Sequence, residues 1–544
     1  MANVLINGNP EIDSRKTLFT SSYSKHTNFG DQKFRIDYNG ARDLRLAEQS
    51  EFEFVISRHA HLLRDAHLCI TLPNIWSPIY PPTEETNDQW APYEFKWIEN
   101  IGAHLIRDVK ITCGAYTLAQ YSGEYIAAVV GRDYSTEKKR TFDEITGNVA
   151  EIHSPEYAYN RINTYPSAYK QLDPATGEYP IAGTEPSIRG RKLNIPLNAW
   201  FSHRSQAAFP LVCLDAGVEL KITVTLRSIQ DLFRVRDVFD PDNSFPYIRP
   251  DFNQLQFQMH RFLQTPPDED VSLGNNAYDN TVNTWNADIH LMTTQTFLEE
   301  AEYNSFIHSG TRSYLVKDVY TYQLDNIAST AKIPLNNSTG MVASWMFRFQ
   351  RNDAFMRNEW DNYTNWPYSR LPGNTQIAPV TGPFQNPIDG RNTGIYLSGD
   401  LRADNRREIV QTVAIVLDGA YREKPQTADV YEHMERLSHS EGYDNRGIHY
   451  YNFCLDTDIE SGQPTGGMNM TKYRKIEIEV SVFPPEIDPV KSEFKIICDG
   501  EGNVISTNQS TWKLHEYAYN ALVFEERYNL VTFSGGSVGL AYVR

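Results

Sequence analysis

Closely spaced histidines offer the sequence's best pattern for a metal site. His59 and His61 are two residues apart, and His67 follows them. Residues two apart on a β-strand share a face, so this first pair could hold a metal ion together with a third ligand. Histidines at surfaces and strand edges are far more common than ligands, and His433 and His439 match the i, i+4 helical ligand spacing poorly. We therefore expect no metal site.

A cluster of carboxylates suggests a second kind of chemistry. Glu299, Glu300 and Glu302 lie within the run FLEEAEY, and paired acids flank the scissile sugar bond in many glycosidases. Nothing in the sequence places two of these acids opposite each other, and clustered glutamates near a strand end are usually solvated. The chain also lacks a Gly-x-Ser-x-Gly elbow. We expect no catalytic residue, no cofactor and no enzyme activity.

The glycine-rich run FSGGSVGL at 533–540 is the closest approach to a phosphate-binding loop. It lacks the Lys-Ser/Thr ending of a Walker A motif and the spacing of a dinucleotide fingerprint, so a tight turn between the last two strands is the better interpretation. Asn-x-Ser/Thr sequons also occur, and we interpret them as coincidences of an Asn-rich chain: they begin at Asn336, Asn337, Asn362, Asn469 and Asn508.

Charge argues against a nucleic-acid partner. The 544-residue chain has 51 basic and 69 acidic residues, a formal net charge of -18, which repels a phosphate backbone. The most basic run, residues 137–140, is short, and we interpret it as a solvated loop rather than a nucleic-acid contact. A direct nucleic-acid contact is therefore not expected.

The cysteines and the apolar runs suggest where the protein folds. Five cysteines are widely spaced and lie in or beside apolar runs, as expected of reduced, buried thiols in a reducing compartment: Cys69, Cys113, Cys213, Cys454 and Cys498. The N-terminal residues show no basic region and no sustained apolar region, and no apolar run approaches the roughly 18 residues that cross a bilayer. We expect a soluble protein made inside a cell.

The elements that would position these residues are mainly strands. Period-2 alternation of apolar and polar residues predicts antiparallel strands at 51–58, 105–112, 218–226, 254–263, 412–419, 474–482 and 493–500. Two short helices are expected, with Ser122 and Asp429 as possible N-caps. The chain therefore has an all-β architecture with few helices.

The order of elements suggests an internal duplication. VKITCGAY at 109–116 and AIVLDGAY at 414–421 both end a strand with Gly-Ala-Tyr, and each is followed by a short helix, a polar stretch and a closing strand. Alternation lapses near residue 235, where we place a boundary. Two long polar, Tyr- and Pro-rich stretches, 132–188 and 350–406, are expected to be ordered and functional.

Four stretches of the chain match the blocks of one known family in the same order. They are the opening Gly8-Asn9-Pro10 with SKHTNF at 24–29, the run FKWIENIGAHLIRDVKITCGAYTLAQYSGEYI at 95–126, the run IPLNAWFSHRSQAAFPLVCL before the strand VELKITVTL, and the ending RYNLVTFSGGSVGLAY. Together they resemble the major capsid proteins of nucleocytoplasmic large DNA viruses. Gly114-Ala115 replaces that family's usual Gly-Gly.

This resemblance implies two consecutive eight-stranded antiparallel jelly rolls with long loop insertions. We expect an N-terminal arm at 1–30, a first jelly roll at 31–235 and a second at 236–544. It further implies homotrimeric, pseudo-hexagonal capsomers that tile an icosahedral shell over an internal membrane. Neighbouring capsomers and minor capsid proteins would be its partners, and it would reside in the virion capsid after assembly in host cytoplasm.

A different class of function remains open at this point. Trp360, Trp366 and Tyr368 lie in one polar stretch, and exposed aromatic rings can stack on sugars. Together with Glu299 to Glu302, they suggest an intracellular carbohydrate-binding or carbohydrate-active β-sandwich protein. Such a protein would remain small in solution, whereas a capsid protein would be a trimer.

Overall fold

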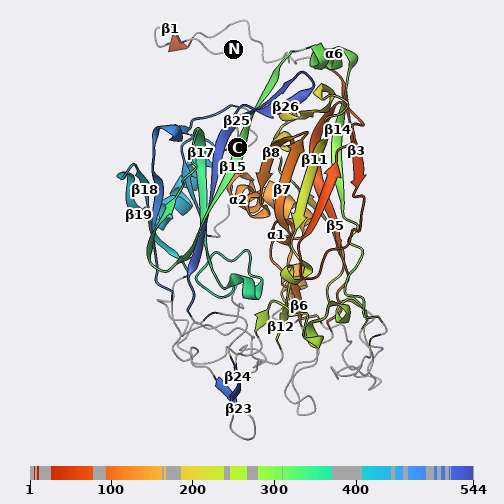
Figure 1. The fold of residues 1–544 in the computed structure, drawn as a ribbon, viewed down its shortest axis with the longest axis vertical. Coiled ribbons are helices and arrows are strands. Elements are labelled where there is room, and N and C mark those ends of the chain that lie inside the picture. The colour runs from red at the N-terminus through yellow and green to blue at the C-terminus, as the bar shows by residue number, and fades with distance from the viewer. Residues whose placement is uncertain are drawn as a thin grey trace.

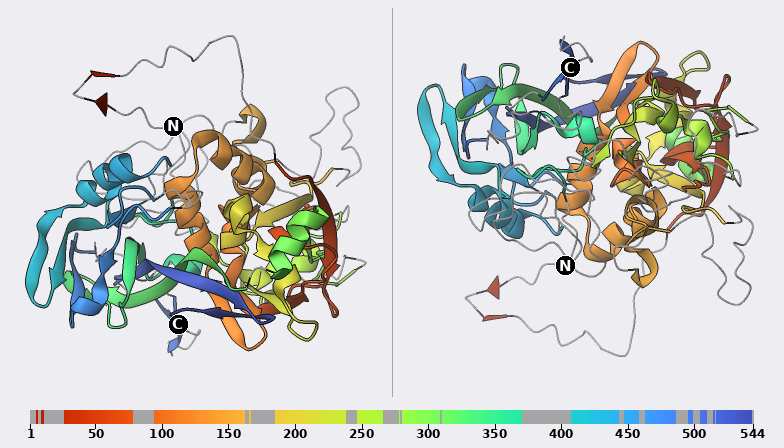
Figure 2. Two further views of the ribbon diagram at one scale, coloured as in Figure 1. Left: turned by 90° about the horizontal axis from the view of Figure 1, so that it is seen from above. Right: turned by 90° about the horizontal axis from the view of Figure 1, so that it is seen from below.

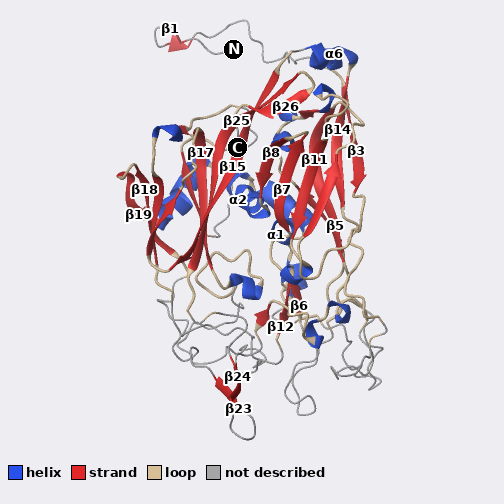
Figure 3. Cartoon of the chain, viewed as in Figure 1, coloured by secondary structure: helices blue, strands red, loops and turns tan. Residues whose placement is uncertain are grey.

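A computed structural model describes most of the chain. The described residues are 5–6, 9–10, 26–77, 94–161, 165–166, 185–237, 246–265, 278, 280–308, 310–369, 407–442, 447–457, 463–485, 495–498, 504–508, 514 and 516–542. Strands dominate these residues, as Figure 3 shows. None of their helices is long and apolar enough to cross a membrane.

The N-terminal strands form a jelly roll of two facing antiparallel sheets. One sheet has the order β3 (Phe29–Asp37), β14 (His290–Leu298), β5 (Leu62–Leu72) and β9 (Arg191–Pro196), with the short β10 (Phe209–Pro210) also on β5. The other has the order β4 (Ser50–Val55), β11 (Leu220–Leu226), β7 (Ile106–Cys113) and β8 (Tyr116–Tyr121). All these pairings are antiparallel, as the alternating pattern predicts.

The C-terminal strands repeat this arrangement. One sheet has the order β15 (Arg312–Ile327), β25 (Tyr519–Ser534), β17 (Met341–Arg351) and β20 (Ile448–Asn452). The other has the order β16 (Thr330–Pro334), β22 (Ile476–Val482), β18 (Val410–Leu417) and β19 (Ala420–Thr427). Within each roll, first, eighth, third and sixth strands form one sheet, and second, seventh, fourth and fifth the other. The predicted duplication into two eight-stranded jelly rolls is confirmed.

Smaller elements decorate the two rolls. The additional strands are β1 (Leu5–Ile6), β2 (Asn9–Pro10), β6 (Phe95–Trp97), β12 (Phe233–Arg236), β13 (Tyr247–Ile248), β21 (Met468–Asn469), β23 (Lys495–Cys498), β24 (Val504–Asn508) and β26 (Ser537–Leu540). The α-helices are α1 (Ile101–His104), α2 (Gly123–Asp133), α3 (Thr136–Thr146), α4 (Ala150–His153), α5 (Trp200–His203), α6 (Glu300–His308) and α7 (Glu435–His439). Elements β6, β12, β23 and β24 gather at one end of the molecule (Figure 1).

Short 3-10 turns and one π-helical turn complete the connections. The 3-10 turns are η2 (Ala158–Asn160), η3 (Ser205–Ala207), η4 (Leu211–Cys213), η5 (Ile229–Asp231), η7 (Leu255–Phe257), η8 (Met259–Arg261), η9 (Ala354–Arg357) and η11 (Met470–Lys472). The π-helical turn η10 (Val430–Met434) leads directly into α7.

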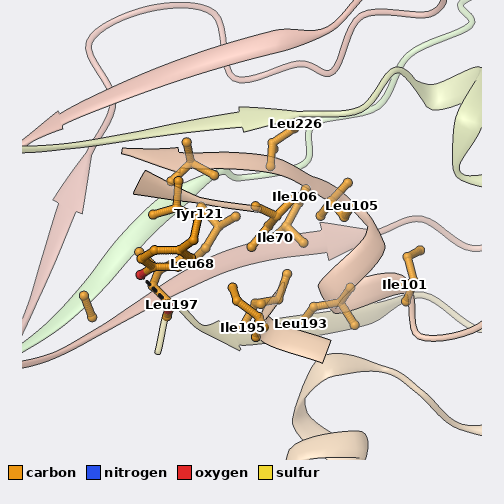
Figure 4. Close-up of a cluster of buried hydrophobic side chains, with 14 of the residues drawn as sticks. Leu68, Ile70, Ile101, Leu105, Ile106, Tyr121, Leu193, Ile195, Leu197 and Leu226 are labelled. Carbon is orange, nitrogen blue, oxygen red and sulfur yellow. Dashed lines mark hydrogen bonds between the residues drawn. The ribbon is translucent and has the colours of Figure 1, made fainter. Parts of the chain in front are cut away.

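Alternation along the strands builds the first core. In β11 the side chains at 220, 222, 224 and 226 are buried and those between them are half-buried, so the apolar half of the strand faces the opposite sheet. Figure 4 shows this packing, with Leu226, Ile106 and Leu193 among the side chains that meet between the sheets. The buried Tyr121 hydroxyl donates to the Leu197 carbonyl at 2.7 Å, which satisfies its only polar group inside this core.

The two Gly-Ala-Tyr sequences lie in equivalent hairpins, β7–β8 and β18–β19. Cys113 pairs with Tyr116, so Gly114 and Ala115 form a two-residue turn in which the glycine has a φ of 57°. In the second hairpin Leu417 pairs with Ala420, and the turn residues are Asp418 and Gly419, both with positive φ. A glycine first and an Asp-Gly pair are the preferences of type II′ and type I′ hairpin turns, respectively.

Several local predictions were wrong. Residues 254–263 form the turns η7 and η8 instead of a strand, and their buried Phe257, Met259 and Phe262 match an irregular 2-then-3 spacing. Asp429 has helical backbone angles and caps nothing with its side chain, whereas Ser122 accepts from the Tyr125 N–H as predicted. Residues 137–140 lie in helix α3 and not in a loop.

The change of sheet does not coincide with the expected boundary at residue 235. Strand β14, well beyond that residue, pairs with β3 and β5 of the first roll. In a jelly roll the last strand lies beside the first. The chain therefore passes through β12, β13, η7 and η8 and then returns to the first roll to form β14. We accordingly propose the division at α6, between β14 and β15. Of the long polar stretches, 132–153 is largely helical, and 370–406 lies outside the described residues.

Candidate functional site at the joint between the two jelly rolls

The histidines proposed as metal ligands have separate partners. His59 stacks on Phe34 with ring centroids 4.5 Å apart, whereas His61 Nδ1 accepts from the Leu298 backbone N–H at 2.9 Å. His67 lies further along β5. No three His, Cys, Asp or Glu side chains in the described part of the chain are arranged to hold a metal. The geometry gives no support to a metal site here.

The carboxylate cluster holds the end of the N-terminal arm. Glu299 accepts a hydrogen bond from the Asn28 backbone N–H at 3.1 Å, and Glu302 accepts one from the Thr27 hydroxyl at 2.6 Å. Glu300 is exposed at the start of α6, a helix that buries none of its residues. Two of these acids are thus engaged with the arm, so their contacts give no support to a glycosidase pair.

The aromatic side chains that suggested sugar binding pack within the chain. The Tyr368 side chain is only 4% exposed, and its hydroxyl donates to the Tyr247 carbonyl at 2.9 Å. Trp360 is half-buried and donates its indole N–H to the Asp231 carbonyl at 2.9 Å. Trp366 is also half-buried. The expected exposed stacking platform is therefore wrong, because Tyr368 is buried and Trp360 is half-buried and bonded to the first roll.

The glycine-rich run at 533–540 is a hairpin turn, as predicted. Ser534 pairs with Ser537, and Gly535 and Gly536 between them have φ values of 56° and 78°. The Gly536 carbonyl accepts a hydrogen bond from the Asp215 N–H at 2.8 Å. Since Asp215 belongs to the first jelly roll, this turn is one of the places where the two rolls meet.

The joint between the rolls contains a fully buried ion pair. Arg132 at the end of α2 donates to both carboxylate oxygens of Glu526 on β25, each at 3.0 Å, and to the Ser344 hydroxyl on β17 at 3.1 Å. Both charged side chains are 0% exposed. The Tyr125 hydroxyl donates to the same carboxylate at 2.7 Å. A two-pronged pair of this kind fixes orientation as well as distance.

The electrostatics of this pair depend on both partners. Burial alone would raise the pKa of Glu526, but the Arg132 guanidinium outweighs burial and lowers that pKa to about 2. The carboxylate is therefore ionised at neutral pH, with its charge compensated inside the protein. Removing either partner would leave a buried charge without its counterion, which is strongly destabilising.

A second charge cluster lies beside the first. Glu124, next to the N-terminus of α2, accepts from Arg227 at 3.0 Å and pairs with Arg348 of β17 at 2.5 Å. Burial raises the pKa of Glu124, but the two guanidinium groups outweigh it and the net shift is downward. Arg227 also lies over the Trp360 ring, 4.1 Å from its centroid. One carboxylate thus links both rolls and the following loop.

The segment 353–369 is the third part of the joint. Asp353 binds Arg351 and Arg357 in the buried base of this segment, with contacts of 2.7 to 3.2 Å, and the two guanidinium groups outweigh burial to hold its pKa below the usual range. Asn358 donates to the carbonyls of Gln230 and Phe233 at 2.7 and 2.6 Å. The segment therefore clamps the second roll onto the first.

A polar groove runs beside the joint, and its charged groups serve the joint itself. Side chains of both rolls line it, including Arg107, Gln120, Thr321, Gln323 and Asn520. The buried cations at its base, described above, are paired with Glu124. The arrangement holds two domains in a fixed relation and offers no nucleophile beside a base among the described lining residues.

The residues of this joint were not singled out from the sequence. Glu526 belongs to the run Glu525-Glu526-Arg527, three consecutive charges within the otherwise alternating strand β25. Charges that interrupt a strand facing a core are a usable signal, since they must be paired when buried. Arg132 gave no such signal, because an arginine near a helix C-terminus is ordinary on a protein surface.

Comparison with known proteins identifies what these two rolls resemble. A family model described as the major capsid protein N-terminus matches residues 17–248. The chain is similar to a probable capsid protein of Acanthamoeba polyphaga mimivirus, 23% identical over 233 residues, and to a major capsid protein of Phaeocystis pouchetii virus, 24% identical over 232 residues. The matched segments cover 43% and 42% of this chain but only 37% and 39% of those proteins.

Solved structures extend the likeness over the whole chain. A chain of the PBCV-1 virus capsid superposes with a TM-score of 0.57 at 14% identity, covering 97% of this chain and 100% of that one. The Faustovirus major capsid protein superposes with a TM-score of 0.58 at 12% identity, covering 96% and 93%. At such identities the likeness shows the fold alone. Its N-terminal sequence is matched by the capsid family model and both of its jelly rolls are matched in fold, so the chain resembles the double jelly-roll major capsid proteins of nucleocytoplasmic large DNA viruses.

Proposed function

We propose that the chain is a structural major capsid protein whose function is self-association. Three copies would form a pseudo-hexagonal capsomer, and many capsomers would tile the icosahedral capsid of a large DNA virus. The proposal is supported by the capsid relatives of the N-terminal part and by the shared double jelly-roll fold. It assigns no catalytic activity to the chain.

The observation that carries the proposal is the exact repeat of strand order. Both rolls arrange their first, eighth, third and sixth strands in one sheet and the other four in the second. A chain with two similar modules presents two similar outer edges, so three chains in a ring present six. This duplication gives a physical reason for a threefold particle to fit into hexagonal packing.

The acidic composition and the gathering of additional strands at one end of the molecule are consistent with a place in a capsid shell. A net charge of -18 disfavours direct contact with the genome. The additional strands β6, β12, β23 and β24 gather at one end (Figure 1), and the α6 helix lies at the other. We propose that the decorated end faces outward and that minor capsid proteins and the internal membrane lie beyond the other end, in particles assembled in the host cytoplasm.

Mass in solution tests this function directly. Light scattering after size exclusion should give about three times the 62.4 kDa mass of the chain, and negative-stain images should show hexagonal outlines. A monodisperse monomer at micromolar concentration would contradict the proposal. The carbohydrate alternative has lost its main support, because Tyr368 is buried and Trp360 and Trp366 are half-buried rather than exposed.

A further inference from the structure

The first jelly roll carries a small additional sheet at the end where β6 and β12 lie. The two rolls lie side by side when the molecule is viewed along its long axis (Figure 2), and this sheet, with strand order β13, β12 and β6, lies beyond the end of the first roll (Figure 1). Helix α4 packs against β6, and the turn η2 follows α4 in the chain. The three strands have only two to four residues each, so the ladder between them is short.

One ion pair of this region differs from the others in the molecule. Lys96 on β6 is the only buried lysine in the part of the chain that the structure describes. Its Nζ donates to Glu156 Oε1 at 2.5 Å, and both side chains are less than a tenth exposed. The other described ion pairs that are buried to this degree have arginine or histidine as the cation. A guanidinium stays protonated, whereas a buried lysine loses its proton readily and is then a nucleophile.

The nearest other carboxylate is already engaged. Arg236 donates to both carboxylate oxygens of Glu94 at 3.3 Å, and the Tyr247 hydroxyl donates to the same carboxylate. Lys96 and Glu156 are thus left to each other. Glu156 Oε2 is buried and has no hydrogen-bond partner among the described residues. A buried ion pair with one oxygen left unsatisfied is costly to keep in its charged form.

The surroundings of the Lys96 amine favour its neutral form. Burial lowers the pKa of Lys96, and the attraction of Glu156 does not make up for it. The amine also lies over the Tyr247 ring, 3.9 Å from its centroid, so the ring closes one side of it and the Glu156 carboxyl group lies in contact with it. Two reactive groups held in contact and away from water react as if they were highly concentrated.

We propose that Lys96 and Glu156 condense to form an isopeptide bond, which makes this pair a site of covalent self-modification. A proton passes from the ammonium to the carboxylate, and the neutral Nζ then attacks Cδ of Glu156. The N–C bond forms, the bond from Cδ to the hydroxyl oxygen breaks, and that hydroxyl leaves with a proton from the nitrogen as one molecule of water. The product is a secondary amide, and the step is neither an oxidation nor a reduction.

Such a bond would covalently tie β6 to the segment that follows α4. The two residues are 60 positions apart, so the bond closes a long loop and restricts the unfolded chain, as a disulfide does. A neutral amide also replaces two buried charges. The described cysteines are free, so this bond would supply a covalent link that does not depend on the redox state of the compartment.

Mass spectrometry of the full-length chain tests the modification. The wild type should be lighter by one water molecule than its sequence requires, and a protease digest should contain a branched peptide that joins Lys96 to Glu156. Lys96→Arg is the matched variant, because it keeps a cation beside Glu156 but forms no amide, and it should have its full sequence mass. Lys221 and Glu53, an ion pair of 2.9 Å at the surface, should appear only in unlinked peptides.

Thermal unfolding provides a second measurement. Lys96→Arg should melt several degrees below the wild type, because its unfolded chain is no longer restricted by the closed loop. A wild-type chain with its full sequence mass and with Lys96 and Glu156 in separate peptides would overturn the proposal, whether or not the variant folds. Neither mass depends on self-association, so a failure here would leave the capsomer proposal standing, and a monomeric chain that carries the bond would contradict the capsomer proposal alone.

Discussion

The helices that follow the fifth strand differ sharply between the two jelly rolls. In the first roll α2 buries seven of its eleven residues, including Ile126, Val129 and Arg132. In the second roll the equivalent segment of η10 and α7 buries only Tyr431 and Arg436. The same topological position is thus an internal contact in one roll and an uncovered surface in the other. A duplicated fold gives two modules but only one joint per chain, so the equivalent surfaces of the other set stay uncovered within a single chain.

The eighth strands show the same difference in their polar residues. β25 carries Glu525, Glu526 and Arg527 at its centre, all buried and paired. The central residues of β14, Thr294 to Thr296, are polar but uncharged. A buried ion pair demands one partner in one geometry, which suits a permanent contact within a chain. Several charged residues of this sheet lie instead on its edge strand β3, where they are exposed to solvent.

The largest change would remove the clamp of the second roll on the first. Deleting residues 355–370 should abolish native trimers and leave soluble monomers or aggregates. Most of this segment is described, and it supplies contacts to both rolls through Asn358, Trp360 and Tyr368. Because those contacts lie within one chain, we also expect the melting temperature of the monomer to fall. Light scattering and calorimetry measure the two effects. Native trimers after the deletion would show that the clamp is dispensable.

Breaking the ion pair of the joint between the two rolls should have the next largest effect. Arg132→Met leaves Glu526 buried without its counterion and should cost about 3–5 kcal/mol of the free energy of unfolding in urea. Arg132 also holds the buried Asp133 carboxylate at 2.7 Å, so the triple variant Arg132→Met with Glu526→Met and Asp133→Asn should recover much of this loss, because it removes all three paired charges.

A matched exposed pair is the control for that comparison. Lys221 and Glu53 form an ion pair of 2.9 Å between neighbouring strands of the first roll, both partly in solvent. Lys221→Ala should lower the free energy of unfolding far less than Arg132→Met does, because solvent screens an exposed pair. Equal losses in the free energy of unfolding for Arg132→Met and Lys221→Ala would mean that burial does not make the ion pair of the joint more important for stability.

Acid should weaken the joint between the two rolls through Glu526. Glu526 has a pKa of about 2 in the folded chain against an ordinary value of 4.5. A lowered pKa stabilises the fold above pH 4.5, and this contribution is lost as the pH falls from 4.5 towards 2. The difference corresponds to about 3 kcal/mol. Urea titrations of the wild type and of Glu526→Gln should therefore show a stability gap at pH 7 that narrows as the pH is lowered to 3.

A difference in stability between the wild type and Glu526→Gln that stays constant from pH 7 to pH 3 would contradict the lowered pKa of Glu526. Glu124 and Asp353 also have lowered pKa values, from their arginine partners, and they remain in both proteins. Their contributions to acid sensitivity therefore cancel in the comparison.

Alternation and turn chemistry made most of the fold predictable. Strands such as β4 and β11 bury alternate residues, so the period of their sequences predicted both that they are strands and which of their faces is buried. The turn at 533–540 was equally readable, because only glycine adopts its backbone freely. The segment 254–263 was wrongly predicted as a strand, because its apolar spacing resembles alternation although its backbone pairs with no described strand.

The joint could not be predicted because its partners are distant in sequence. Arg132 and Glu526 are 394 residues apart in the sequence, and neither residue type by itself indicates that a side chain is buried. The return of β14 to the first roll was missed for a similar reason: its pairing with β3 depends on tertiary arrangement and not on its local sequence. Periodicity indicates which face of a strand is buried, but not which sheet receives it.

The smallest expected effect compares the two Gly-Ala-Tyr hairpins directly. Gly114→Ala and Gly419→Ala each place a side chain at a left-handed backbone position, at φ values of 57° and 83°, and each should cost about 1–2 kcal/mol in urea unfolding. The new methyl group would meet nothing within 4 Å at Gly419 and only ordinary contact with Val218 at Gly114, so the cost is one of backbone conformation. Gly217→Ala, without a positive φ or a near neighbour, should be neutral or slightly stabilising.

The second hairpin should be the more sensitive of the two. Asp418, directly before Gly419, already has a φ of 49°, so Gly419→Ala makes two consecutive non-glycine residues left-handed. The Asp418 carboxylate also accepts from the backbone N–H groups of Arg474 and Lys475, each at 2.8 Å, which prevents the turn from relaxing freely. Gly114 has a single left-handed position to keep. A larger loss at Gly114 than at Gly419 would mean that the contact of the first turn with Val218, rather than backbone conformation, decides the stability of these matched turns.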